Sequence, residues 1–346
     1  MATRPDHRPN LRWLRAAARA ALRPVGPDRL AASVLGACVL GASVLGASVL
    51  GIGPVDAAAL DDGASDLRSQ RVAEGFICSD ELDGWACPPL QQQVDAGSVR
   101  KGVYRQCARV DGVVDFNGAW LKDVVCDGKA ALIARDGAVI RDVRITDVSI
   151  GINANCVRWD GGTVVLDRLT CMGADMGVLG YGRRLTIQDS HIAETRTDGA
   201  NLGHLVYACP MQAGASALVI ARTRLIAPGA KGHVLKTGCA STRIVDSTLD
   251  GGARGYARLI DAFNGGRLVV ADSRLIAGPD AASTAMIGYG AEMRQRHADN
   301  RVELSGGVMD CRHMPIWGSS LRTWPVQLIP DAVTWTPTDV RGCPQP

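Results

Sequence analysis

Short segments in the middle and second half of the chain carry side chains that could transfer protons or neutralise an acidic group. They align without gaps as GVLGY from 177, GHLVY from 203, GHVLK from 232, ARLID from 257 and AMIGY from 285. Their fifth positions hold Tyr181, Tyr207, Lys236, Asp261 and Tyr289. Their second positions add His204, His233 and Arg258. Histidine, lysine and tyrosine act as general acids and bases, and arginine binds carboxylates, so the pattern predicts a polar row with acid–base chemistry.

The third residue of each segment is aliphatic and is expected to fill a core. These residues are Leu179, Leu205, Val234, Leu259 and Ile287. Strict alternation would place positions two and five on opposite faces of a strand, so a corner or bulge must bring them to one groove. A row with the spacing of stacked strands suits an extended polymer better than a compact metabolite.

Each member of the row also has a purely structural interpretation. Tyr181 and Tyr289 could line a wall without acting as acids, and the two histidines, each after a glycine, could be satisfied turn residues. Lys236 and Asp261 could form a surface ion pair that contributes under about 1 kcal/mol.

Further polar residues follow the row. Asn264 opens the sequence Asn264-Gly265-Gly266, which is typical of a turn, and is a candidate for binding a ligand. Glu292 closes the segment YGAE and is expected to brace Arg258. No cluster of metal ligands is evident in the sequence, so no cofactor is expected, with a bound Ca²⁺ as the alternative.

A recurring eight-residue phrase predicts the elements that position the row. It reads AWLKDVVC at 119, AVIRDVRI at 138, VVLDRLTC at 164, LTIQDSHI at 185, LVIARTRL at 218, TRIVDSTL at 242, LVVADSRL at 268 and VELSGGVM at 302. The third residue is always aliphatic and the eighth apolar, with a period of two that is typical of half-buried strands. Third positions lie 19 to 34 residues apart, which suits a coil with loops of variable length. The phrase predicts an all-β fold, a right-handed parallel β-helix, with a propeller or β-sandwich as the alternative.

The fifth position of the phrase is mostly aspartate. It holds Asp123, Asp142, Asp189, Asp246 and Asp272, with Arg168 and Arg222 in two other copies. Such a column looks catalytic, but aspartate between two short strands more often forms a sharp turn and bonds neighbouring amides. We therefore expect turns, with the arginines relieving repulsion between stacked carboxylates.

The N-terminal 58 residues have the composition of a long secretory signal peptide. Seven arginines against three aspartates accompany near-copies of ASVLG between Ala32 and Gly51, and a small-residue cleavage site ends at Ala58. An uncleaved membrane anchor, or a lipoprotein leader using Cys38, is the alternative. Removal of the leader leaves 31 Lys and Arg against 32 Asp and Glu, a formal charge of −1. We expect no nucleic-acid partner and no stable membrane insertion after cleavage.

Ten cysteines remain after the leader, and an even number favours disulfides in an oxidising periplasmic or extracellular compartment. Sequence proximity and strand register favour the pairs 78–87, 107–126, 156–171, 209–239 and 311–343, although connectivity is not deducible from sequence. Cys126 and Cys171 occupy apolar positions of the phrase and could be core thiols.

These signals divide the chain into parts. Residues 1–58 are a signal peptide, residues 59–102 an N-terminal cap, residues 103–310 the β-helix and residues 311–346 a C-terminal capping tail. The tail holds Trp317, Trp324 and Trp335 with several prolines, a composition expected for irregular chain over the last rung. A monomer is expected.

The segments GHLVY, GHVLK, RLIDAFNGG and MIGYGAE resemble those of a group of exported bacterial right-handed β-helix proteins, related by fold to pectate lyases and alginate-modifying enzymes. The resemblance covers residues 200–292 closely and residues 119–310 by repeat pattern. It implies the fold and an acidic polysaccharide ligand. The aspartate clusters that hold Ca²⁺ in pectate lyases have no clear counterpart here, and the alginate-epimerase motif DPHD is absent.

The leading hypothesis is a secreted polysaccharide lyase that cleaves a uronate-containing chain by β-elimination. This reaction needs a group that neutralises the sugar carboxylate, a base for the neighbouring proton and an acid for the leaving oxygen. The expected roles are neutralisation by Arg258 or His204, proton removal by Lys236 or His233, protonation by Tyr207, and orientation of the lysine by Asp261.

Alternatives from other classes stay open at this point. A glycoside hydrolase would use Asp261 with Glu292 as its pair of carboxyl groups. A non-catalytic glycan-binding or envelope structural protein would account for the lack of a metal cluster and of a sharply diagnostic motif. The sequence therefore leaves open whether the protein is an enzyme.

Overall fold

The computed structural model describes residues 61–126, 130–149, 154–193, 203–210, 214–226, 232–252, 256–278, 281, 285–290, 297–310, 326–328 and 334–338. The predictions for the signal peptide at 1–58, for Glu292 and for a bond between Cys311 and Cys343 lie outside these residues. They stay predictions.

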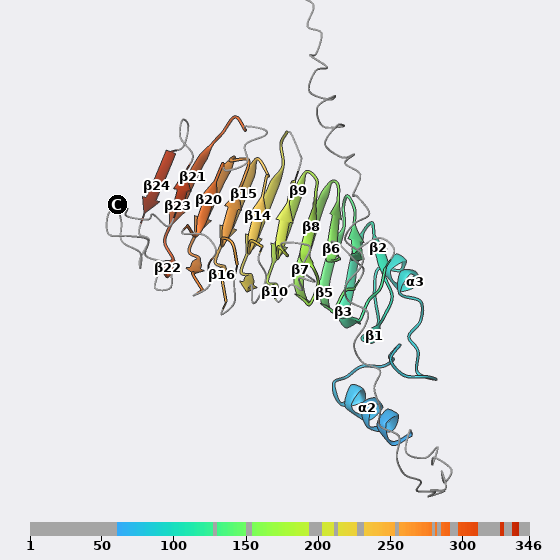
Figure 1. Ribbon diagram of the computed structural model, residues 1–346. Helices are drawn as coiled ribbons and strands as arrows, with labels where there is room; N and C mark the ends of the chain where they lie inside the picture. The colour runs from blue at the N-terminus through green and yellow to red at the C-terminus, as the bar shows by residue number, and fades with distance from the viewer. Residues whose placement is uncertain are drawn as a thin grey trace, which may run out of the picture. The chain divides into compact units, whose positions relative to one another are not determined.

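Most of the described chain belongs to two sheets of parallel strands, seen as successive arrows from green to red in Figure 1. The larger sheet comprises β1 (Val103–Tyr104), β3 (Val113–Lys122), β5 (Val139–Thr146), β7 (Thr163–Met172), β9 (Arg184–Gln188), β10 (His191–Ala193), β12 (Ala217–Ala221), β13 (Arg224–Ile226), β15 (Ser241–Val245), β16 (Thr248–Asp250), β18 (Arg267–Ala271), β19 (Arg274–Ile276), β21 (Arg301–Ser305), β22 (Val308–Asp310) and β24 (Thr334–Thr338). The smaller sheet comprises β2 (Ala108–Val110), β4 (Ala130–Ala134), β6 (Asn155–Asp160), β8 (Met176–Tyr181), β11 (Val206–Ala208), β14 (Leu235–Thr237), β17 (Ile260–Ala262), β20 (Ile287–Tyr289) and β23 (Val326–Leu328).

The strands follow one another in a repeated order along the chain. From β11 in the smaller sheet the chain passes to β12 and β13 in the larger one, and β14, β15 and β16 repeat that order. Each strand pairs in parallel with the strand at the same place in the next coil. This is the arrangement of a parallel β-helix, so the predicted fold class is confirmed and the antiparallel alternatives are wrong.

The apolar positions of the phrase form two continuous columns inside the coils. The third positions pair in register as Ile140, Leu166, Ile187, Ile220, Ile244, Val270 and Leu304. The eighth positions pair as Ile145, Cys171, Ile192, Leu225, Leu249, Leu275 and Met309. Every one of these side chains is at most 5% exposed, so stacking of the coils buries the face that a single coil would leave in water.

The expected register is wrong for the first copy of the phrase. Leu121 pairs with Ile145, an eighth position, and not with the third position of the next copy. The strand β3 begins earlier than the phrase, and its corner is formed by Asn117 and Gly118, with φ of 51° and 74°. Because this corner is Asn-Gly and not a single aspartate, aligning the copies on the aspartate at the fifth position placed the first copy in the wrong register.

The fifth-position residues of the other copies form the sharp turns that the sequence predicts. Asp142, Arg168, Asp189, Arg222, Asp246 and Asp272 all have φ between 48° and 54°. Aspartate tolerates this left-handed conformation better than most residues do. Arg222 donates to Asp189 of the preceding coil through Nε and Nη2, both at 2.7 Å, which confirms the expected relief of carboxylate repulsion.

The prediction that the corner aspartates bond neighbouring amides is wrong, because in the described coils those bonds are accepted by the hydroxyl of the residue that follows the corner. Ser190, Thr223, Ser247 and Ser273 are buried one above another, and the amide of each of the first three donates to the hydroxyl of the next coil at 3.1 to 3.3 Å. Each hydroxyl in turn donates to the carbonyl two residues earlier in its own coil. This hydroxyl ladder satisfies backbone groups that the turns take out of the sheet.

Helical segments precede the first coils. The helix α2 (Asp61–Ala73) ends near Arg71, whose guanidinium lies over the ring of Trp120 and bonds Glu81. The short helix α3 (Leu90–Asp95) buries Leu90 and Val94 in the hydrophobic core. Within the described residues, no helix has the length and apolar character needed to span a lipid bilayer.

The two described segments of the C-terminal tail, residues 326–328 and 334–338, are strands. The strand β23 pairs in parallel with β20, and β24 pairs with β21 in the larger sheet. Trp335 pairs with Val302 in this register. Residues 326–328 and 334–338 therefore extend both sheets, where irregular chain was expected.

Four of the five expected disulfides are present, and they join Cys78 to Cys87, Cys107 to Cys126, Cys156 to Cys171 and Cys209 to Cys239. The third bond joins β6 to β7 through the buried core, and the fourth links successive coils at a Cα–Cα distance of 5.0 Å. The interpretation of Cys126 and Cys171 as core thiols is therefore wrong. Disulfides in this number indicate an oxidising compartment and support export of the protein.

Candidate functional site

The strands β11, β14 and β17 of the smaller sheet hold the candidate site. Tyr207 pairs with Lys236, and Lys236 pairs with Asp261, so the fifth positions of these segments lie side by side on successive coils. Leu205, Val234 and Leu259 are fully buried, as expected, and the chain bends at each of them before the strand begins. The predicted corner is present.

This bend brings the second positions to the fifth positions. The rings of His204 and Tyr207 meet edge to face with centroids 5.2 Å apart, although strict alternation would separate them. Arg258 and Asp261, which hold the equivalent positions two coils further on, are joined by a bond of 3.1 Å from Nη1 to Oδ1. We refer below to the six residues of these three coils as the polar row: His204, Tyr207, His233, Lys236, Arg258 and Asp261.

The two imidazoles of the polar row stack on each other. Their centroids lie 5.2 Å apart, with an angle of 14° between the ring planes. The backbone N–H of His233 donates to Nδ1 of His204 at 2.8 Å. In a neutral ring whose Nδ1 accepts, the proton is on Nε2, so His204 presents Nε2–H as a donor.

Asp261 joins two members of the row. Its side chain is 2% exposed; Oδ2 lies 3.3 Å from Nε2 of His233, and Oδ1 accepts from Arg258. The carboxylate therefore orients an imidazole and a guanidinium. With Nε2 of His233 directed at Asp261, the lone pair of that ring lies on Nδ1.

Lys236 lies between two aromatic faces. Its ammonium is 5.4 Å from the ring centroid of Tyr207 and 5.1 Å from that of Phe263. The two rings are themselves 6.1 Å apart and nearly perpendicular. A cation held over aromatic rings is stabilised by their quadrupoles.

Burial lowers the pKa of both imidazoles. Desolvation, and then the charge of Lys236, lowers the pKa of His204 to about 3. Desolvation, and then the neighbouring His204, Lys236 and Arg258, lowers the pKa of His233 to about 2. Both rings are neutral at neutral pH, so the contact between His233 and Asp261 is a hydrogen bond from a neutral imidazole and not an ion pair.

Two buried polar atoms at this end of the sheet have no hydrogen-bond partner among the described residues. One is Nδ1 of His233, whose residue is 9% exposed, and the other is Oδ1 of Asn264, whose residue is 3% exposed. Unpaired buried polar atoms cost free energy unless water or a ligand satisfies them. Asn264 opens the predicted turn, in which Gly265 and Gly266 have φ of 76° and 87°.

Tyr181 lies apart from the polar row. Tyr207 pairs with Leu179 of the preceding coil, so the alignment of the first segment is shifted. Tyr181 pairs with Asp160 and is 47% exposed. Leu179, expected in the core, occupies the half-buried outward position in its place.

Tyr289 also lies apart from the row. Asp261 pairs with Gly288, which shifts the last segment by one residue and turns Tyr289 into the core, where it is 2% exposed. Its hydroxyl donates to the carbonyl of Gly266, and burial raises its pKa above the usual value. Tyr289 thus braces the Asn264 turn. Glu292, expected to brace Arg258, lies outside the described residues.

Sequence reasoning missed two residues that shape the site. The ring of Phe263 lies beside the ammonium of Lys236. The chain has only three phenylalanines, and this rarity was the sequence feature that could have drawn attention to Phe263. Gly288 makes room for Arg258, because a Cβ there would lie 2.8 Å from Cδ and Nη1 of the arginine. The shifted register of the last segment hid that role.

Among the described residues, no group of three or more His, Cys, Asp and Glu side chains is arranged to hold a metal ion. Comparisons with protein-family models, with curated proteins and with solved structures find no match to this chain. The class that the fold defines is therefore a parallel β-helix protein, and its activity has to be inferred from the site.

Proposed function

We propose that this protein is an exported polysaccharide lyase that cleaves a uronate-containing chain by β-elimination at the polar row. The observation that carries the proposal is the pairing of Tyr207, Lys236 and Asp261 on successive coils, with His204, His233 and Arg258 bent back beside them. A linear row of donors, a cation and an oriented imidazole fits a polymer lying across the coils. The proposal includes the relation to pectate lyases that the sequence resemblance implies.

In the proposed reaction, Arg258 and Lys236 neutralise the sugar carboxylate. A guanidinium already fixed by Asp261 binds a carboxylate at a low entropic cost. Neutralisation makes the adjacent C–H bond acidic enough for a protein base to break. The electron pair of that bond forms the C=C bond, the glycosidic C–O bond breaks, and the leaving oxygen takes a proton from Tyr207.

We assign the base to His233. Its Nδ1 is buried and unpaired among the described residues, and Asp261 holds the opposite nitrogen. A pKa of about 2 keeps the ring unprotonated and ready to accept, but it also makes the free imidazole a weak base. The carboxylate of a bound uronate would raise this pKa by placing a negative charge beside the ring.

The test is the ultraviolet absorbance of unsaturated uronate products, measured with purified mature protein on polygalacturonate, alginate and neutral glucan. We expect product from an acidic polymer and none from the glucan. His233→Gln and Tyr207→Phe should each lower turnover at least about 100-fold while polymer binding is retained. His191→Gln, a histidine of β10 in the other sheet, is the matched control. Absence of product from every acidic polymer would contradict the proposal.

A second candidate is a non-catalytic glycan-binding protein. The low pKa of both histidines favours it, because proton transfer is most efficient when the pKa of the acid or base lies near the working pH. Neutral imidazoles and a fixed guanidinium suit hydrogen bonding to sugars equally well. Binding without product in the same assay, lost in Lys236→Ala, would support this candidate.

A glycoside hydrolase that uses Asp261 fits the geometry less well. Both carboxylate oxygens of Asp261 contact neighbours, His233 and Arg258, which suits an orienting role better than attack on a sugar.

A further inference from the structure

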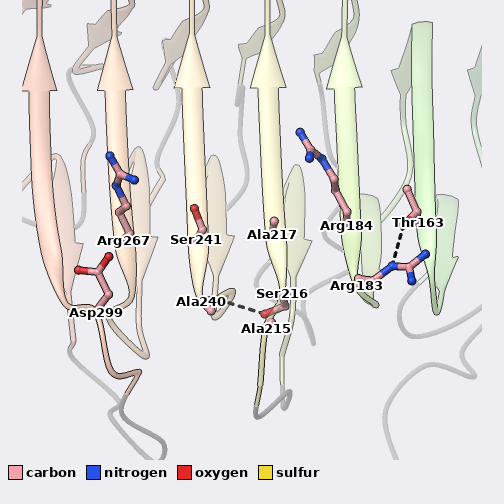
Figure 2. A pocket seen from close by; sticks show the side chains of 10 residues that line it. All are labelled: Thr163, Arg183, Arg184, Ala215, Ser216, Ala217, Ala240, Ser241, Arg267 and Asp299. Carbon is pink, nitrogen blue, oxygen red and sulfur yellow. Dashed lines mark hydrogen bonds between the residues drawn. The ribbon is translucent and has the colours of Figure 1, made fainter.

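A groove lies on the larger sheet, over the outer face of β9, β12, β15 and β18. Its volume is about 590 Å³, and Figure 2 shows the side chains that line it. The lining residues are Thr163, Arg183, Arg184, Ala215, Ser216, Ala217, Ala240, Ser241, Arg267 and Asp299. None of them belongs to the polar row, and no pattern in the sequence groups them.

The strand register explains the shape of this groove. Arg184 pairs with Ala217, Ala217 with Ser241, and Ser241 with Arg267, so all four side chains start from equivalent positions on successive strands. Figure 2 shows the long side chains of Arg184 and Arg267 standing on either side of the two short ones. Parallel strands repeat at roughly 4.8 Å, which separates the two arginine positions by about 14 Å.

The groove carries a net positive charge. Three arginines line it against one carboxylate, Asp299. Arg183 donates to Thr163, forms an exposed ion pair with Asp136 at 3.7 Å from Nη2 to Oδ1, and has a side chain 72% exposed. Arg267 donates through Nε and Nη2 to Glu303, which leaves Nη1 for another acceptor.

Arg184 is the most available cation of the groove. It is exposed, and the described residues provide it with no ion-pair partner. Ser241, at the base of the groove, has a part-exposed hydroxyl that could bond a sugar hydroxyl. The lining therefore offers guanidinium groups for carboxylates at both ends and the small side chains of Ala217 and Ser241 between them.

We propose that this groove is an auxiliary binding surface for an anionic polysaccharide strand that lies along the coils, with one acidic group at Arg184 and another at Arg267. The identity of the polymer rests on the function proposed above, but the surface itself does not depend on catalysis. No lining residue is aromatic, so the groove lacks the stacking platforms of single-stranded nucleic-acid sites.

The test is binding of polygalacturonate, measured by calorimetry with mature protein carrying His233→Gln, which should remove turnover of the ligand while polymer binding is retained. Arg184→Ala with Arg267→Ala should weaken binding roughly tenfold, because each exposed ion pair changes a binding constant by up to about fivefold. Binding should also weaken as salt is raised. Arg274→Ala, an exposed arginine of β19 outside the groove, is the matched control and should leave binding unchanged.

Several outcomes would overturn the inference. These are unchanged polymer binding in the double variant, an equal loss in Arg274→Ala, and tighter binding of single-stranded DNA or anionic vesicles than of the polymer at the same groove. Circular dichroism of the double variant confirms that its fold is intact. A protein that binds through Arg184 and Arg267 yet forms no unsaturated product would contradict the proposed lyase activity and leave this surface standing.

Discussion

The imidazole of His233 and the carboxylate of Asp261 come from successive coils of the β-helix and meet at 3.3 Å, from Nε2 to Oδ2. Their contact depends on the register that pairs Lys236 with Asp261 and on the bend that precedes each strand. The same carboxylate holds Arg258. One buried acid thereby fixes the direction of two groups that the proposed reaction uses.

Replacement of this acid should damage both stability and activity. Asp261→Asn removes the charge that faces Arg258 in a site where the aspartate is 2% exposed, and breaking such a buried pair costs about 3 kcal/mol. We expect a lower urea midpoint and loss of turnover on any uronate polymer that the wild-type protein cleaves. Asp246→Asn is the control, because Asp246 is an exposed corner residue and asparagine tolerates its φ of 49°. Equal effects of the two substitutions would contradict the role of Asp261.

The buried histidines predict a loss of stability in acid. The folded-state pKa values of His204 and His233 lie below the unfolded value, so the unfolded chain binds more protons as pH falls through about 6.5. The stabilisation from the neutral histidines is therefore complete well above pH 6.5 and is lost as the pH falls toward the folded values of about 3 and 2, by about 2 kcal/mol per histidine between pH 7 and pH 5.

Urea unfolding at pH 7 and pH 5 measures this decline. In His204→Gln the difference between the two pH values should shrink, whereas His191→Gln, in the other sheet, should keep the wild-type difference. The same pH dependence in both variants would show that His204 is not buried as a neutral ring.

The hydroxyl ladder predicts a specific cost for losing one oxygen. Thr223 is fully buried; its Oγ1 accepts from the amide of Ser190, and its own amide donates to Ser247. Thr223→Val keeps the shape but leaves the Ser190 amide unsatisfied, which costs about 2 kcal/mol. Thr223→Ser keeps the hydroxyl and should cost less than Thr223→Val in the same unfolding measurement. If Thr223→Val were as stable as Thr223→Ser, the hydroxyl ladder would not contribute to the stability of the fold.

The bond between Cys156 and Cys171 predicts a dependence on oxidising conditions. It crosses the core between the two sheets and closes a loop of 15 residues, for which the loss of the crosslink corresponds to about 3 kcal/mol. The double substitution to alanine should lower the urea midpoint clearly. In that double variant, reduction should cause no further loss from this pair. Peptide mapping of the wild-type protein should recover the four described disulfides. A different connectivity would contradict the coil register on which the site rests.

The repeated phrase predicted the coils because each coil must bury an apolar residue at the same two positions. Ile187 and Ile192 are these two residues in one copy. The turns were equally predictable, since Asp189 tolerates a left-handed conformation that most residues avoid. Ser190 follows the corner and was not singled out, because a hydroxyl ladder becomes apparent only when the coils are stacked.

The site could be predicted in its three central coils and not at its ends. His204, His233 and Arg258 each come one residue before a bend, and a strand of the smaller sheet follows each bend. Aligning these three segments in sequence therefore also matched the positions of their side chains in the structure. At either end the alignment without gaps failed, because Leu179 and Gly288, and not Tyr181 and Tyr289, occupy the paired positions. The first segment is shifted by two residues, which keeps its faces, and the last by one residue, which exchanges them. Single-sequence patterns do not resolve such shifts.

The most direct measurement of the central claim is a crystal structure of mature protein carrying His233→Gln with a uronate oligosaccharide. We predict a saccharide across β11, β14 and β17, with a carboxylate against Arg258 and Lys236 and a sugar carbon facing the side chain at position 233. A saccharide bound only at another face, or a polar row that stays closed to saturating oligosaccharide, would contradict it.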